Sequence, residues 1–149
     1  MGVNYFQVIF REDADTWISV SDILYFFEDK NTNSLEFIVS SEETGFRHLY
    51  YVQANIASNI PDAEEEVFQR LRLQPQIIDK VPLTSGEWSV SQYHQIEVDP
   101  VRKLVYFHGY KDSPTEKHGY VVAINRPCHI RRLTEANFSH SCKFFVVRH

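Results

Sequence analysis

The 149-residue sequence is 43% hydrophobic and 14% aromatic, enough apolar material for one folded domain and too much for intrinsic disorder. Fifteen basic against twenty acidic residues give a net charge of −5 without a basic stripe, which argues against nucleic acid and anionic membranes as partners. No apolar run approaches the roughly 20 residues that span a bilayer, and the N-terminus has no signal-peptide pattern. Cys128 and Cys142 are too few for a disulfide framework, so we expect a cytoplasmic protein with reduced thiols.

The N-terminal third alternates β-rich runs with polar turns. Residues 5–10 (YFQVIF) predict a strand, and residues 17–27 predict a short strand followed by a bend. Residues 35–40 and 48–52 then form two β-rich runs around the polar turn SEETG, which predicts an antiparallel hairpin.

Residues 54–74 interrupt the β pattern. Pro61 suits the first turn of a helix, the acidic residues that follow suit its positive N-terminal end, and two arginines suit its last turn. Apolar side chains recur at every fourth position, at Ala63, Val67 and Leu71. We therefore predict one short surface helix near 61–72, inserted in a loop.

The β pattern returns in the C-terminal half. Residues 81–90 predict β structure around a turn at 84–86, with Trp88 pointing into an interface between sheets. Residues 95–98 predict a short strand. Runs at 103–107 and 118–124 predict a second hairpin, whose polar loop contains Gly, Asp, Ser and Pro. Finally, residues 130–134 predict a short edge strand and residues 143–147 a last strand.

Several residues repeat at fixed spacings along the chain. The run His48, Tyr50 and Val52 recurs as His118, Tyr120 and Val122 at one constant spacing. The run Leu83-Thr84 with Trp88 recurs as Leu133-Thr134 with Phe138 at a second, shorter spacing. The insertion at 54–74 accounts for the difference between the two spacings. Repeats of several short strands are typical of propeller blades. The sequence thus predicts an all-β fold, a partial β-propeller of about two antiparallel blades plus flanking strands.

Motifs for chemistry are missing. None of the five glycines flanks a serine in the G-x-S-x-G spacing of a nucleophile elbow, and phosphate-binding and dinucleotide fingerprints are absent too. His140-Ser-Cys142 and Cys128-His129 lack zinc-site spacing, so we expect no metal and no cofactor. Glu42-Glu43 is interpreted as a pair of solvated turn charges, either of which can pair with Arg47 across the hairpin.

Blocks along nearly the whole chain outside 54–74 resemble the propeller domain of the dipeptidyl peptidase IV family, above all its cytosolic branch, dipeptidyl peptidases eight and nine. The blocks are WISVSDI (17–23), EETGFRHLY (42–50), LTSGEW (83–88), LVYF (104–107), KDSP (111–114), YVV (120–122), RLT (132–134) and FSHSC (138–142).

The resemblance implies a serine exopeptidase that removes N-terminal dipeptides ending in Pro or Ala, in which a propeller caps an α/β-hydrolase domain. The catalytic Ser/Asp/His triad of the family belongs to that hydrolase domain. We therefore expect residues 1–149 to be part of a propeller domain, without the catalytic domain and inactive alone. Ser21 and Asp22 fall where family members line the pocket for the substrate's second residue. The Glu42-Glu43 pair belongs to a different motif from the family's glutamates for the substrate amino group.

Two functions remain open. One is a non-catalytic scaffold and substrate gate of a dipeptidyl peptidase, with the parent's hydrolase domain and peptide substrates as partners and a homodimer possible in the full-length protein. The other is a stand-alone interaction module that acts on a full-length relative by strand pairing. Two blades leave faces and edges open, so we also expect the isolated chain to self-associate.

Overall fold

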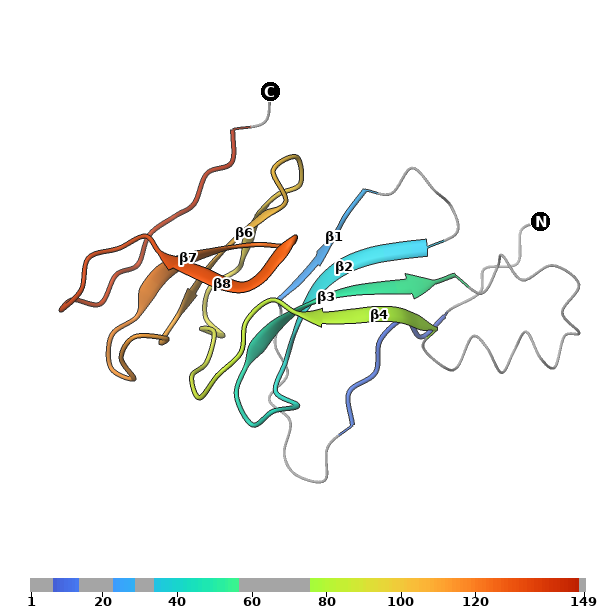
Figure 1. Ribbon diagram of the computed structural model, residues 1–149, viewed down its shortest axis with the longest axis horizontal. Helices are drawn as coiled ribbons and strands as arrows, with labels where there is room; N and C mark the ends of the chain where they lie inside the picture. Colours follow the sequence, from blue (N-terminus) through green and yellow to red (C-terminus); the bar gives the residue numbers. More distant parts are fainter. Residues whose placement is uncertain (1–6, 14–22, 29–33, 57–75, 148–149) are drawn as a thin grey trace, which may run out of the picture.

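The computed structural model describes residues 7–13, 23–28, 34–56 and 76–147, which contain eight strands and no helix (Figure 1). The strands form two four-stranded antiparallel sheets, each with its strands in sequence order. The first sheet holds β1 (Leu24–Phe26), β2 (Ser34–Ser41), β3 (His48–Asn55) and β4 (Ile77–Pro82). The second holds β5 (Glu97–Asp99), β6 (Leu104–Gly109), β7 (His118–Ala123) and β8 (Arg126–Arg132). Two such meanders confirm the prediction of a partial propeller with about two blades.

Both predicted hairpins are present. Strands β2 and β3 pair from Ser34 opposite Asn55 to Ser41 opposite His48, and β6 and β7 pair from Leu104 opposite Ala123 to Gly109 opposite His118. The predicted edge strand near residue 130 is β8, which begins earlier than expected. The predicted helix at 61–72 and the predicted strand near Trp17 lie outside the described residues.

Two predicted strands at the ends of the chain are wrong where the structure describes them. Residues 7–10 and 143–147 have no strand partner. Their apolar side chains pack on sheet faces instead: Phe10 meets Phe37 edge-on, with ring centroids 6.3 Å apart, and Phe144 lies 5.4 Å from Tyr106. In both segments the apolar side chains pack on a sheet face, although the backbone does not pair with a strand. An apolar run can therefore cover a sheet without being part of it.

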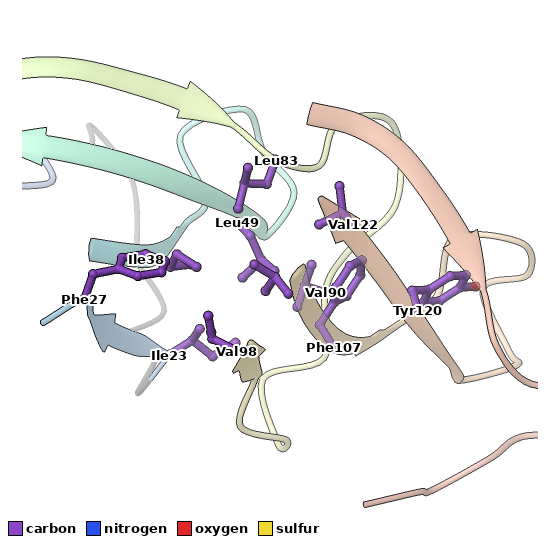
Figure 2. Close-up of a cluster of buried hydrophobic side chains, with 11 residues drawn as sticks. Ile23, Phe27, Ile38, Leu49, Leu83, Val90, Val98, Phe107, Tyr120 and Val122 are labelled. Atoms are coloured by element: carbon purple, nitrogen blue, oxygen red, sulfur yellow. The ribbon is translucent and has the colours of Figure 1, made fainter. Parts of the chain in front are cut away.

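The largest core lies between the two sheets (Figure 2). Because side chains alternate along a strand, one face of each sheet turns inward. The first sheet and its flanks contribute Ile23, Phe27, Ile38, Leu49 and Leu83. The second sheet and its flanks contribute Val90, Val98, Val105, Phe107, Tyr120 and Val122. Fully burying a side chain of this kind stabilises the fold by about 1.5–3 kcal/mol, so this cluster is what holds the two sheets together.

The ring of Trp88 lies between the two sheets, as the sequence predicted, and we call this residue the wedge. It follows β4 in the chain, yet its ring stacks on Phe107 of β6 at 6.3 Å and 15° and lies 6.2 Å from Tyr120 of β7. The indole N–H donates to the Ser85 carbonyl at 2.8 Å. Gly86, with a φ of 122°, leaves room for this ring, because a Cβ there would lie 2.8 Å from the indole nitrogen.

The face of the first sheet turned away from the second carries a smaller cluster of Phe37, Tyr50, Val52 and Ala54. Phe10 packs against this cluster. In the repeat, Phe37 and Tyr50 correspond to Phe107 and Tyr120 of the second sheet. Phe10 therefore covers the first sheet at the place where Trp88 covers the second.

The face of the second sheet turned away from the first is built differently. It carries His108 and Gly119 at the positions that Ile38 and Leu49 occupy in the first sheet. The segment after residue 140 covers it: the Phe144 ring lies 5.0 Å from His108, and a Cβ on Gly119 would be 3.0 Å from the Cys142 sulfur. The missing side chain at Gly119 makes room for that segment.

Candidate functional site

The polar residues of the repeat gather where the second hairpin strand of each sheet begins. In the first sheet the Thr84 hydroxyl lies 2.9 Å from Nδ1 of His48 and accepts the amide of the next residue at 3.0 Å. In the second, the Thr134 hydroxyl lies 2.9 Å from Nδ1 of His118 and accepts the following amide at 3.2 Å. We call each His–Thr pair a bracket, because it ties the start of one strand to the segment that leaves the next.

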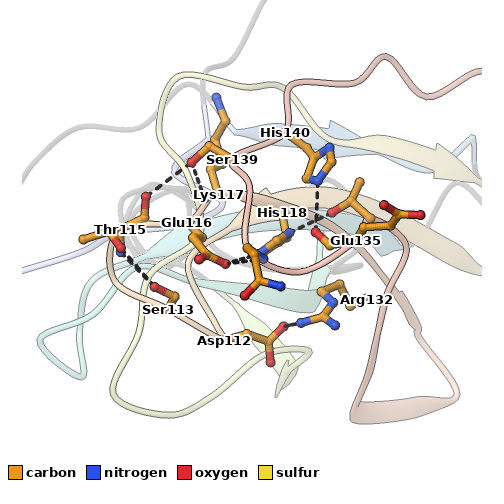
Figure 3. Close-up of polar contacts among 12 residues, drawn as sticks. Asp112, Ser113, Thr115, Glu116, Lys117, His118, Arg132, Glu135, Ser139 and His140 are labelled. Carbon is orange, nitrogen blue, oxygen red and sulfur yellow. Dashed lines mark hydrogen bonds and ion pairs between the residues drawn. The ribbon is translucent and has the colours of Figure 1, made fainter.

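The two brackets differ at the other imidazole nitrogen. Nε2 of His48 donates to the Gly86 carbonyl at 2.9 Å, so Nδ1 accepts the threonine proton. Burial lowers the pKa of His48, and the bond to Gly86 offsets part of that effect. Nε2 of His118 instead donates to the Glu116 carboxylate at 3.2 Å, and the same carboxylate oxygen accepts the Asn137 amide at 3.1 Å (Figure 3).

Backbone bonds around the brackets repeat as well. The residue 90 amide donates to the residue 47 carbonyl at 2.9 Å, and the residue 140 amide donates to the residue 117 carbonyl at 2.7 Å. The amides of residues 47 and 117 in turn donate to Ser89 and Ser139 hydroxyls at 3.1 and 3.2 Å. The two spacings seen in the sequence thus correspond to one bonding pattern made twice.

Glu42 and Glu43 point to different partners, as expected of neighbours in a turn rather than a binding pair. Arg47, only 5% exposed, pairs with Glu42 at 2.5 Å, which decides between the two pairings that the sequence left open. Glu43 pairs with Lys80. The ammonium of Lys80 also lies 4.6 Å from the ring centre of Tyr50. Each carboxylate is thus paired with a different cation.

A hollow of about 430 Å³ opens beside Glu43, between the β2–β3 turn and the segment after β4. Phe46 and Glu87 stand in its walls, and Tyr50 is among its lining residues. The pKa of Tyr50 is raised to about 12, mainly by burial and then by the nearby carboxylate of Glu43. No sequence motif marks this hollow, and it was not predicted.

Among the described residues, His94 makes contacts with two serine hydroxyls. Its Nδ1 lies 3.1 Å from the Ser91 hydroxyl, and its Nε2 lies 3.2 Å from the Ser141 hydroxyl and 3.3 Å from the Lys117 ammonium. A Ser-His-Asp triad needs a carboxylate on the second imidazole nitrogen. His94 meets a hydroxyl and an ammonium there, and burial and Lys117 lower its pKa. This arrangement is not a hydrolytic triad.

A thiol and an imidazole meet nearby. Nε2 of His108 accepts the Cys142 amide at 3.3 Å and lies 3.3 Å from its sulfur. Burial, then His94 and Lys117, lowers the pKa of His108 to about 4. Burial raises the pKa of the Cys142 thiol, which disfavours the thiolate. Cys128 is free as well, and the described residues hold no cluster of three metal-ligating side chains.

Ser21 and Asp22, the predicted lining of a substrate pocket, lie outside the described residues. Within the part of the chain that the structure describes, no helix is long and apolar enough to cross a bilayer. The site residues brought together are therefore those of the repeat: the brackets, the wedge and the hollow beside the first bracket.

Two stacked four-stranded meanders with repeated brackets define a segment of a β-propeller. Residues 3–148 match the family model for the dipeptidyl peptidase IV (DPP IV) N-terminal region, and the chain belongs to this family. It is similar to dipeptidyl peptidase 8 of Homo sapiens and of Mus musculus, with 40% identity over 139 residues in each case. The match covers 91% of this chain and 16% of each relative, so the chain spans a small part of their length. The resemblance seen in the sequence is confirmed.

Proposed function

We propose that this chain is a non-catalytic propeller segment, a scaffold and substrate gate, of a serine-type dipeptidyl peptidase that removes N-terminal X-Pro or X-Ala dipeptides. The observation that carries the proposal is the pair of stacked meanders in a chain of the DPP IV N-terminal family. The similarity to dipeptidyl peptidase 8 supports the release of dipeptides.

The chemistry of the described residues supports a role without catalysis. The histidine with two serine contacts, His94, has no carboxylate partner among them, and burial raises the pKa of the Cys142 thiol. In this proposal the peptide-cleaving groups come from the hydrolase domain of the parent protein. Ser21 and Asp22 line the path of the substrate, and the protein works in the cytoplasm, within a homodimer of the full-length parent.

Two measurements test the proposal. The purified 149-residue chain should release nothing from a Gly-Pro chromogenic substrate, and turnover that survives repurification would contradict the non-catalytic role. The second measurement places residues 3–148 in human dipeptidyl peptidase 8 in exchange for the matching region.

The chimera addresses the role as scaffold and gate. If the segment serves the same role, the chimera folds and cleaves Gly-Pro substrates, with a larger change in KM than in kcat for long peptides. A control chimera carries Ser21→Ala and Asp22→Ala, which should raise KM further if these residues line the substrate path. If the chimera folds but its KM is unchanged by the exchange and by the two alanine substitutions, the role as a substrate gate is contradicted.

A further inference from the structure

The loops beside the two brackets are closed in one sheet and open in the other. In the second sheet the Glu116 carboxylate joins the β6–β7 loop to the segment after β8, through the Asn137 amide at 3.1 Å. The Ser139 hydroxyl adds a bond to the Thr115 carbonyl at 3.3 Å (Figure 3). These bonds hold the two loops together.

Phe46 and Glu87 stand at the corresponding places in the first sheet. Phe46 has the same position relative to its bracket histidine as Glu116, and Glu87 has the same position relative to its bracket threonine as Asn137. A phenylalanine ring has no oxygen to accept the residue 87 amide, so the bridge is not made there. The hollow of about 430 Å³ occupies that place. The opening is thus a specific departure from a pattern that the other sheet keeps.

The hollow is suited to a cation on an apolar stem. Glu43 and Glu87 reach it from opposite loops, and the Phe46 ring is 36% exposed beside them. Lys80 is already engaged, since it pairs with Glu43 and lies over the ring of Tyr50. The Glu87 carboxylate has no counter-ion among the residues that the structure describes. Among the lining residues that the structure describes, one negative charge is therefore unbalanced, and it lies next to an aromatic surface.

We propose that this hollow binds the arginine side chain of an extended peptide segment of a partner protein. The planar guanidinium matches a carboxylate with two parallel hydrogen bonds, here to Glu87, and stacks on an aromatic ring, here Phe46. The methylene stem lies along the rest of the ring. The proposal goes beyond the proposed peptidase role and does not depend on it, because every group involved belongs to the first sheet and its loops.

Fluorescence anisotropy with the full 149-residue chain tests the proposal. The probe is a dye-labelled pentapeptide with a central arginine and blocked ends, and the matched probe carries citrulline, which has the same shape without the charge. We expect millimolar binding of the arginine peptide, at least about threefold tighter than citrulline and weakening as salt is raised. Equal binding of both peptides, or no binding of either, would overturn the proposal.

Three variants locate the site. Glu87→Gln should lower the affinity for the arginine peptide by about threefold and remove the preference over citrulline. The control is Glu135→Gln, an acid in the same segment of the second sheet, which should change nothing. Phe46→Glu restores the residue found at 116 and should close the hollow, so binding should be lost while the circular dichroism spectrum is kept. Tighter binding by the Phe46→Glu variant, or an equal loss in the control, would rule out this location.

Discussion

The two sheets share the hydrogen bonds of the His–Thr brackets and differ in what Trp88 and Phe138, the matching aromatic residues of the repeat, touch. The distance from Nδ1 to the threonine hydroxyl is 2.9 Å in both brackets, and the following amide lies 3.0 Å from the hydroxyl in one and 3.2 Å in the other. Yet Trp88 is stacked on the second sheet, whereas its counterpart in the repeat, Phe138, is 69% exposed. Each bracket is local to one sheet and its flanking segment. A wedge is buried only if another sheet lies next to it.

The second difference concerns the faces. The first sheet presents Ile38 and Leu49 to its neighbour, and the second presents His108 and Gly119 to the chain's own segment after residue 140. A face of branched aliphatic side chains suits a flat apolar partner. A face with a glycine and an imidazole suits a narrow segment held by one hydrogen bond.

The largest expected effect tests the wedges. Trp88→Ala should lower the free energy of unfolding by about 3–5 kcal/mol, because it leaves a cavity between the sheets. Phe138→Ala should change it by less than about 0.5 kcal/mol, because most of that ring already faces solvent. Urea unfolding followed by far-ultraviolet circular dichroism measures both. Similar losses in the two variants would mean that Phe138 is buried in solution, by self-association for example, which a repeat at tenfold dilution would reveal.

The next effect tests the covered face of the second sheet. The folded pKa of His108 is about 4, below its ordinary value of 6.5, so between these values the unfolded chain holds more protons than the folded chain. Its contribution to stability is complete above pH 6.5 and is lost as pH falls toward 4, by about 3 kcal/mol in all. Protonation also removes the lone pair that accepts the Cys142 amide.

His108→Gln is the matched variant for this pH dependence. Urea midpoints measured from about pH 7.5 to 4 should fall less steeply in the variant, and the remaining slope should come from His48 and His94, whose pKa values are also lowered. An unchanged slope would assign the acid sensitivity to other groups.

A smaller effect tests the brackets. Thr84→Val removes the hydroxyl shared by His48 and the following amide in a fully buried place, and should cost about 1–3 kcal/mol. Thr134→Val makes the same change where the threonine is partly exposed, so water replaces part of the loss. The ratio of the two losses in unfolding free energy, measured with urea, reports how well each bracket is shielded from water. A larger loss for Thr134→Val would reverse the ranking drawn from burial.

The smallest effect tests two ion pairs, one beside each sheet. Lys80 with Glu43 near Tyr50, and Arg132 with Asp112 near Tyr120, are both partly exposed. Double-mutant cycles should give about 0.2–1 kcal/mol for each, falling as salt is added. A coupling energy well above this range for only one ion pair would show that the two pairs differ in burial more than their exposed fractions indicate.

Much of this fold was predictable because the repeated residues have the same structural role in both sheets. His48 and Tyr50 recur at 118 and 120 since the bracket and the wedge surface need those side chains. The end segments were predicted as strands from their apolar runs, and this failed because the backbone around Phe10 and Phe144 has no ladder to join. Apolar periodicity alone does not separate a strand from a cover.

The candidate site was less predictable for a physical reason. The divergence of Glu42 and Glu43 follows from the turn, and the sequence indicated it. The hollow arises because a bond between two loops is not made, and that bond joins a side chain to a backbone amide far along the chain. Only a comparison of Phe46 with Glu116, aligned through the brackets, points to it from the sequence.

The difference between the two repeat spacings lies in the connection between β3 and β4. Residues 56–76 join β3 to β4, whereas only residues 124–125 join β7 to β8. The brackets lie at the opposite end of these strands, and their His–Thr contacts are the same in both sheets. In a blade of this kind, the connection at one end of the strands can thus vary in length, whereas the hydrogen bonds at the other end are repeated. We expect inserted reporters or modules to be tolerated at the first end, and single substitutions to change the contacts at the second.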